Sequence, residues 1–222
     1  MYNSEQVNGG GNSFGTLSMN LEPGTYRLMV FAHNEKNGNP ISVGTDGSIQ
    51  GYNNRATDSF SYSDEVVITK NKRKAVNCKL TRCVAFVSFS STDAIPAEVT
   101  KFRVSLTGVS SKYDLRNQIG ADAATYTTAM VNINNWKSSA GMMVNVESFV
   151  FLPSLETNIN AKLEFYNSTD ELVLTRNIEG IHMKINSKTS VSGVFFQSDG
   201  ADAAVTVDSE WGEPINFDAN GN

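Results

Sequence analysis

The sequence predicts an all-β protein of the sandwich type, and three observations support this prediction. Apolar residues recur with a period of two far more often than with the helical period of about 3.6. No window of a dozen residues carries an amphipathic helical stripe, so helices should be few, with residues 113–119 the best candidate for one or two turns. About a dozen short apolar segments are separated by turn residues, as in β-sandwiches.

Strands with one buried face show strict alternation. Phe102, Val104 and Leu106 alternate with polar or charged residues, which is typical of a half-buried antiparallel strand. Leu163 and Phe165 repeat the pattern. We therefore expect these five side chains to face a core.

Other strands are apolar on both faces, which predicts interior positions in a sheet. These segments are residues 26–32, 83–89 and 142–152. The remaining expected strands are 66–69, 172–175, 178–185, 191–196, 205–207 and 215–217. Turn sequences such as Glu22-Pro23-Gly24 and Asp46-Gly47 separate the strands.

The length of 222 residues fits one large sandwich or two smaller ones. Near residues 110–124 a clean alternating strand gives way to a polar stretch that contains Gly and Ala. We therefore predict two domains, residues 1–110 and 111–222. A chain of this size buries about 70% of the surface of its unfolded form, so it needs no disulfide or metal to fold.

Charge and composition exclude several classes of partner. The net charge is −5 and the pI about 5.1, so the surface as a whole does not attract nucleic acid or anionic lipid. The one basic cluster, Lys70, Lys72, Arg73 and Lys74, is interpreted as a solvated loop between two strands. Charged residues are 18% of the chain, and the polar remainder is rich in neutral turn formers, which favours an extracellular β protein.

Membrane and export signals are not visible in the sequence. Residues 1–12 are polar and Gly-rich, without the basic and apolar regions of a signal peptide. No run of about 18 apolar residues is present, so we expect no membrane-spanning helix. An exported protein with this sequence is expected to be a processed form.

Catalytic, cofactor and metal sites are not predicted, so we expect a protein that is not an enzyme. The two histidines, His33 and His182, have no His, Cys or carboxylate partner at ligand spacing. Asp208, Glu210 and Glu213 flank a tryptophan, but they lie on one short segment and do not face each other across a cleft.

Aromatic residues suggest an alternative function. Trp136, Tyr166 and Trp211 are candidates for a platform on which sugar rings stack, although core packing is the more common role of aromatics in sandwiches. The alternative is therefore a glycan-binding surface lipoprotein.

Several phrases of the sequence resemble the fimbrillin-type fimbrial proteins of the Bacteroidales. The clearest phrase is 21–34, in which a Pro-Gly turn precedes Thr25, Tyr26 and an apolar strand. The other phrases are 80–89, 95–104, 149–153, 163–166, 185–195 and 205–217. Together they cover most of the chain, and they are structural phrases without a catalytic signature.

The resemblance implies two tandem transthyretin-like β-sandwich domains of the Greek-key type. It also implies a structural or adhesive subunit at the cell surface or outer membrane, exported as a lipoprotein. Its partners would be other fimbrial subunits, joined by β-strand exchange, together with host or bacterial surface ligands. Membrane attachment would come only from an N-terminal lipid anchor, and no lipidated cysteine or processing arginine precedes Arg27.

The exchanged strand has one candidate near the C-terminus. The residues are Val205, Val207, Trp211, Ile215 and Phe217, in which apolar positions alternate around a bend. They either complete their own domain or enter a neighbouring subunit.

The start of the chain leaves two possibilities open. The first plausible strand is 14–21, which leaves an N-terminal groove for a donor strand; in the other interpretation residues 7–21 already fill that position.

Overall fold

The computed structural model describes residues 4–7, 14–34, 41–51, 55–133, 146–196 and 204–208. Within these ranges all regular structure is β-strand, which confirms the all-β prediction. The strands are β1 (Gly24–His33), β2 (Ile41–Val43), β3 (Ser48–Gly51), β4 (Ser59–Ile68), β5 (Thr81–Arg82), β6 (Ala85–Ser91), β7 (Lys101–Asp114), β8 (Ile119–Thr127), β9 (Val131–Asn132), β10 (Val146–Val150), β11 (Glu156–Tyr166), β12 (Leu172–Lys184), β13 (Lys188–Gly193) and β14 (Ala204–Asp208).

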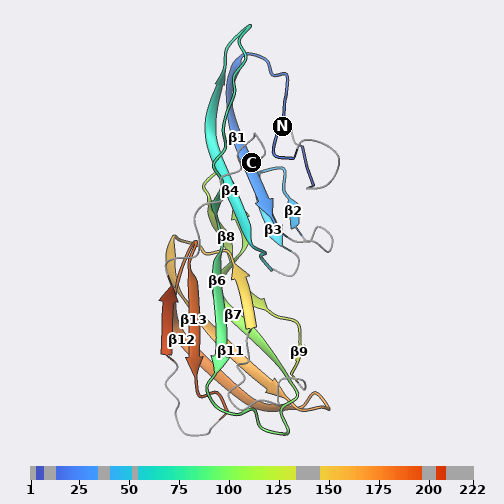
Figure 1. The fold of residues 1–222 in the computed structure, drawn as a ribbon, viewed down its shortest axis with the longest axis vertical. Helices are drawn as coiled ribbons and strands as arrows, with labels where there is room; N and C mark the ends of the chain where they lie inside the picture. Colours follow the sequence, from blue (N-terminus) through green and yellow to red (C-terminus); the bar gives the residue numbers. More distant parts are fainter. Residues whose placement is uncertain are drawn as a thin grey trace.

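These strands form three sheets, which we call the small, the long and the C-terminal sheet. The small sheet has the order β1-β4-β5, and the C-terminal sheet has the order β10-β6-β13-β14. The long sheet contains seven strands in the order β12-β11-β7-β3-β2, with β8 and β9 paired to β7. Figure 1 shows the small sheet toward one end of an elongated molecule and the C-terminal sheet toward the other.

Strand β7 connects the two ends of the molecule. Its first half pairs with β11, and its last three residues pair with β3. Between these regions Gly108 has a positive φ of 92°, and the register with β8 shifts at the same point. This β-bulge bends the strand where its pairing partner changes.

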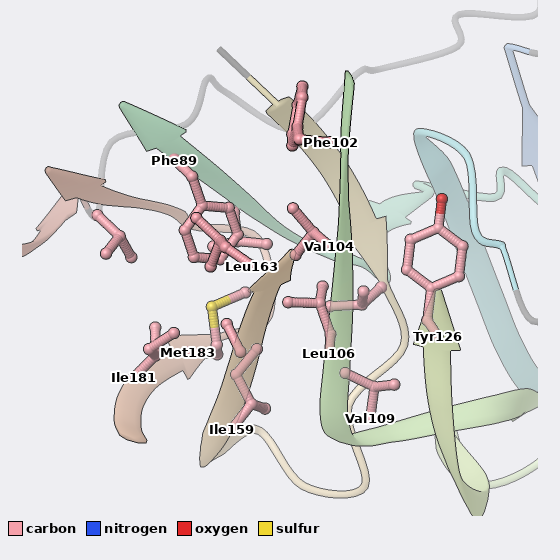
Figure 2. Close-up of a cluster of buried hydrophobic side chains, with 14 of the residues drawn as sticks. Phe89, Phe102, Val104, Leu106, Val109, Tyr126, Ile159, Leu163, Ile181 and Met183 are labelled. Carbon is pink, nitrogen blue, oxygen red and sulfur yellow. The ribbon is translucent and has the colours of Figure 1, made fainter. Parts of the chain in front are cut away.

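The large core lies between the C-terminal sheet and the β7-β11-β12 part of the long sheet (Figure 2). The predicted inward residues Phe102, Val104, Leu106, Leu163 and Phe165 are all fully buried there, as the alternation indicated. The opposite sheet contributes mainly side chains of β6.

The small core lies between the small sheet and the β2-β3 end of the long sheet. Ile49 and Tyr113 are buried in it, and Met29 and Phe31 of β1 pack against it. The Tyr113 hydroxyl lies 2.8 Å from Ser61 Oγ of β4, which joins the two layers. Each core is therefore covered by two sheets, as expected for sandwich packing.

The sheets combine strands from both halves of the sequence. The boundary expected at residue 110 lies inside β7, and β6 pairs with β10 and β13 from the second half. The division into 1–110 and 111–222 therefore does not follow the sheets, because pairing partners far apart in sequence are invisible to local composition. The count of two domains stays a prediction.

The predictions for residues 113–119 and 26–32 were wrong. Residues 113–119 contain no helix: Asp114 ends β7, and its carboxylate accepts hydrogen bonds from the backbone N–H groups of Arg116 and Asn117, which makes a hairpin turn. Residues 26–32 are not an interior strand either, because β1 lies at the end of the small sheet. The prediction for residues 83–89 is confirmed, since β6 lies between β10 and β13.

Candidate assembly surface

The most unusual surface in the described part of the chain is the free edge of β1, which we call the β1 edge. All ten residues of β1 pair with β4 on one side. Among the described residues no strand pairs with the other side, because β1 ends the small sheet. Its backbone N–H and C=O groups on that side are a template for another strand.

The side chains of β1 are apolar but only half-buried. Residues 28–32 read Leu-Met-Val-Phe-Ala, and none of these side chains is fully buried. By contrast, the interior strand β6 has four apolar residues among its seven, and all four are buried. The segment 28–32 thus has the composition of an interior strand and the exposure of an edge strand.

Alternation divides these side chains between the two faces of the small sheet. Met29 and Phe31 point toward the small core, where the Phe31 ring lies 6.4 Å from the ring of Tyr113. Leu28 and Val30 therefore point to the opposite face, beside Asp64 and Tyr62 of β4. Both faces of the edge present apolar surface to an added strand.

Charges are few along the β1 edge. Arg27 is the one charged residue of β1 before His33, and its guanidinium lies 3.4 Å from Ser63 Oγ. On β4, the Tyr62 hydroxyl donates to Asp64, and burial together with that contact raises the pKa of Tyr62. Natural sheet edges are commonly protected by charges, proline or short length, and residues 28–32 have none of these protections.

The segment before β1 is mostly exposed and does not belong to a sheet. Residues 16–22 form no strand, so the expected first strand at 14–21 is wrong. Leu17 and Met19 are 53% and 41% exposed. The sequence of this segment does not reveal whether a pairing partner exists.

The candidate donor residues are only partly described. Val205 and Val207 lie in β14, which pairs antiparallel with β13 of the same chain. Trp211, Ile215 and Phe217 lie outside the described residues. The structure thus places the start of the candidate donor in its own sheet, at the end of that sheet.

The candidate glycan platform is not assembled by the described residues. Tyr166 is only 8% exposed, and the Arg103 guanidinium lies 5.4 Å from the centre of its ring. Trp136 and Trp211 lie outside the described residues. Tyr166 therefore offers little ring surface to a sugar.

The basic cluster forms an exposed turn, as predicted. Lys70, Lys72, Arg73 and Lys74 are all exposed between β4 and β5. The described ranges contain no group of three or more His, Cys, Asp or Glu residues placed to hold a metal ion. Nor do these ranges contain a helix that is long and apolar enough to cross a membrane.

The β1 edge was not identified from the sequence. The available signal was the uncharged apolar run at 28–32 directly after the Glu22-Pro23-Gly24 turn. That run has the same appearance in an interior strand and in an unprotected edge strand. The pairing of the whole sheet is needed to distinguish them.

Comparisons with known proteins place the chain in a family and relate its fold to solved structures. A family model described as "Family of unknown function (DUF6562)" matches residues 2–222. No curated protein matches the sequence.

Two solved structures are similar to this chain, and the first of them supports its fold. A "putative adhesin" from Bacteroides ovatus has a TM-score of 0.54 at 16% identity, with 72% of this chain and 66% of that chain covered. The fimbrial anchor protein Mfa2 from Porphyromonas gingivalis has a TM-score of 0.46 at 10% identity, with 84% and 76% covered. The chain thus spans about two thirds of the length of the adhesin. The first similarity agrees with the all-β sandwich fold that the sequence resemblance implied.

Proposed function

We propose that this chain, which belongs to the family of unknown function DUF6562, is a structural or adhesive subunit of a bacterial surface fimbria. The proposal rests on its fold and on the β1 edge. The role is non-enzymatic, and the site of action is the cell surface. Within the cell surface, the proposed location is the outer membrane, with attachment through an N-terminal lipid anchor.

The observation that supports this function best is the β1 edge. A ten-residue edge strand with an uncharged apolar run is an aggregation hazard in a protein that acts alone. The same edge is useful in a subunit that receives a strand from a neighbour, because added main-chain hydrogen bonds provide affinity and apolar side chains provide register. The similarity of fold to an adhesin supports the same conclusion.

We propose that the added strand comes from residues 205–217 of another copy or of a related subunit. The apolar positions Val205, Val207, Ile215 and Phe217 would contact the half-buried side chains of the β1 edge. Donation by Val205 and Val207 requires β14 to leave β13, with which it pairs in the single chain. Strand exchange has this general form, since the same segment fills its own sheet or that of a neighbour.

Light scattering of the purified chain tests assembly. We expect slow growth of oligomers that a synthetic peptide of residues 203–218 blocks, because the peptide occupies the β1 edge. A chain truncated after Gly200 should fold but fail to grow. Loss of folding in this truncated chain would instead show that the pairing of β14 with β13 is required for folding, which would contradict donation.

A charge on the β1 edge tests the acceptor. Val30→Lys places an ammonium group on the half-buried edge and should stop growth. Val67→Lys is the matched control, since Val67 is 58% exposed on β4, where it pairs with Thr25 of β1 and lies outside the β1 edge. Equal growth of both variants, with unchanged melting temperatures, would contradict the role of the β1 edge.

A further inference from the structure

A basic turn lies at one end of the molecule, and its charges are not compensated locally. We define the basic turn as residues 69–74, with the cations Lys70, Lys72, Arg73 and Lys74. All four side chains are exposed, and none forms an ion pair with another described residue. The whole chain has a net charge of −5, so this turn is a local exception.

The backbone of the basic turn is fixed. The Lys72 N–H donates to the Thr69 carbonyl at 3.2 Å, and Asn71 has a φ of 62°, a conformation that asparagine tolerates well. The four cations are therefore presented from a defined loop that extends beyond the small sheet (Figure 1).

The basic turn lies at the end of the β1 edge. It directly follows Ile68, the last residue of β4, which pairs with Gly24, the first residue of β1. A strand added to the β1 edge would lie two strand spacings from β4, about 10 Å away. At physiological salt the Debye length is about 8 Å, so charges on the added strand itself are largely screened from these cations, and the basic turn acts on charges that approach it more closely than that.

The C-terminal part of the sequence has the opposite charge. No Lys, Arg or His follows Lys188, whereas six acidic residues lie between positions 199 and 218. Four of them, Asp208, Glu210, Glu213 and Asp218, lie within or beside the candidate donor 205–217. The acidic groups thus accompany the apolar residues that were proposed to enter a neighbour.

We infer that the basic turn of one copy binds the acidic segment 208–218 of the next copy. This inference rests on the proposed assembly and adds an electrostatic docking step to it. Exposed ion pairs contribute little individually, but a cluster of positive charges that faces a cluster of negative charges accelerates encounter and disfavours wrong partners. The contact should therefore weaken with added salt.

Binding of a fluorescent peptide of residues 203–218 to the full chain, measured by anisotropy, tests the contact. Four substitutions, Lys70→Glu, Lys72→Glu, Arg73→Glu and Lys74→Glu, should weaken binding about tenfold or more. A peptide with lysine at 208, 210, 213 and 218 should bind this variant better than the unmodified chain. Arg116→Glu, a single charge reversal in the exposed turn between β7 and β8, is the matched control for Lys72→Glu alone, and it should bind the original peptide more tightly than Lys72→Glu does.

The outcomes separate this inference from the proposed function. The docking contact is supported if peptide binding weakens with added salt, weakens in the four-fold variant and is recovered by the peptide with reversed charges. This holds even if the chain does not form oligomers. Equal peptide binding by the unmodified chain and the four-fold variant would overturn the docking contact and leave strand exchange standing. A chain that neither binds the peptide nor forms oligomers would overturn both.

Discussion

At the scale of single residues, Asp93 connects two strands of the C-terminal sheet. Its buried carboxylate accepts hydrogen bonds from Ser91 Oγ and from the backbone N–H groups of Phe195 and Phe196, the latter two at 2.8 Å. Burial acts to raise the pKa of Asp93, but the hydrogen bonds from Ser91 and from the two N–H groups together outweigh it, so the pKa is lowered.

Replacing Asp93 tests this anchor. Asp93→Ala leaves two N–H groups without an acceptor and should lower the free energy of unfolding by about 2–3 kcal/mol in urea titrations. Because the folded pKa is lowered, the stabilisation is present above the unfolded pKa near 3.9 and is lost as pH falls through the folded value. The difference in the free energy of unfolding between the wild type and Asp93→Ala should therefore become smaller at low pH. A difference that does not change with pH would contradict an ionised anchor, and Asp93→Asn is the isosteric control.

Arg82 links the small sheet to the β12–β13 turn. Its guanidinium binds both oxygens of Asp58 at 2.7 and 3.3 Å, donates to Asn186 Oδ1 at 3.2 Å and stacks over the Phe60 ring. The two charged side chains are only 11% and 17% exposed.

Loss of the Arg82 guanidinium leaves the Asp58 carboxylate poorly solvated. Arg82→Ala should cost about 2 kcal/mol, between the values typical of exposed and fully buried pairs. Arg82→Lys should recover only part of it, because an ammonium cannot reproduce the planar, bidentate contact. A double-mutant cycle with Asp58→Ala measures the coupling, and a coupling near zero would show that the packing on Phe60 dominates.

At the scale of elements, the bulge in β7 depends on Gly108. A Cβ at this position would lie 3.4 Å from the Asn158 carbonyl oxygen, and the φ of 92° disfavours any other residue. Gly108→Ala should therefore destabilise the protein by about 1–2 kcal/mol or more in thermal unfolding. Gly180→Ala is the matched control, since Gly180 also has a positive φ but no atom within 4 Å. Equal losses would show that backbone conformation alone matters.

Sequence patterns predicted those strands that bury one face against a core, because their apolar residues alternate with polar ones. Phe102, Val104 and Leu106 alternate, so β7 was recognisable, although its continuation beyond residue 106 was not. The sequence analysis missed the short strands β2 and β3, and β8 with its Ala121-Asp122-Ala123-Ala124 sequence. These strands are defined by their pairing with β3, β7 and each other, and not by an alternating apolar pattern of their own.

The candidate site was predictable only in its parts. The apolar run 28–32 and the basic cluster are both visible in the sequence, and each is ordinary by itself. Their proximity follows from the pairing of Gly24 with Ile68, and the free edge follows from the position of β1 at the end of the small sheet. Both are properties of the sheet and not of either segment.

At the scale of the whole molecule, β7 couples the two cores. It contributes Phe102, Val104, Leu106 and Val109 to the large core and Tyr113 to the small core. A strand that belongs to both cores cannot leave one without disturbing the other. Although the chain exceeds the size at which all-or-none unfolding is usual, we expect the two cores to unfold together.

Hydrogen exchange of the two ends measures this coupling. Ile49 lies in the small core and Leu163 in the large core, and both are fully buried, so truncation of either to alanine should cost about 2–5 kcal/mol. If β7 unites the cores, each variant lowers protection equally in the β1–β4 amides and in the β11–β12 amides, and chemical denaturation stays a single transition. If Ile49→Ala lowers protection only in β1 and β4, the ends are independent domains, and the boundary must lie at the Gly108 bulge, where β7 exchanges β11 for β3.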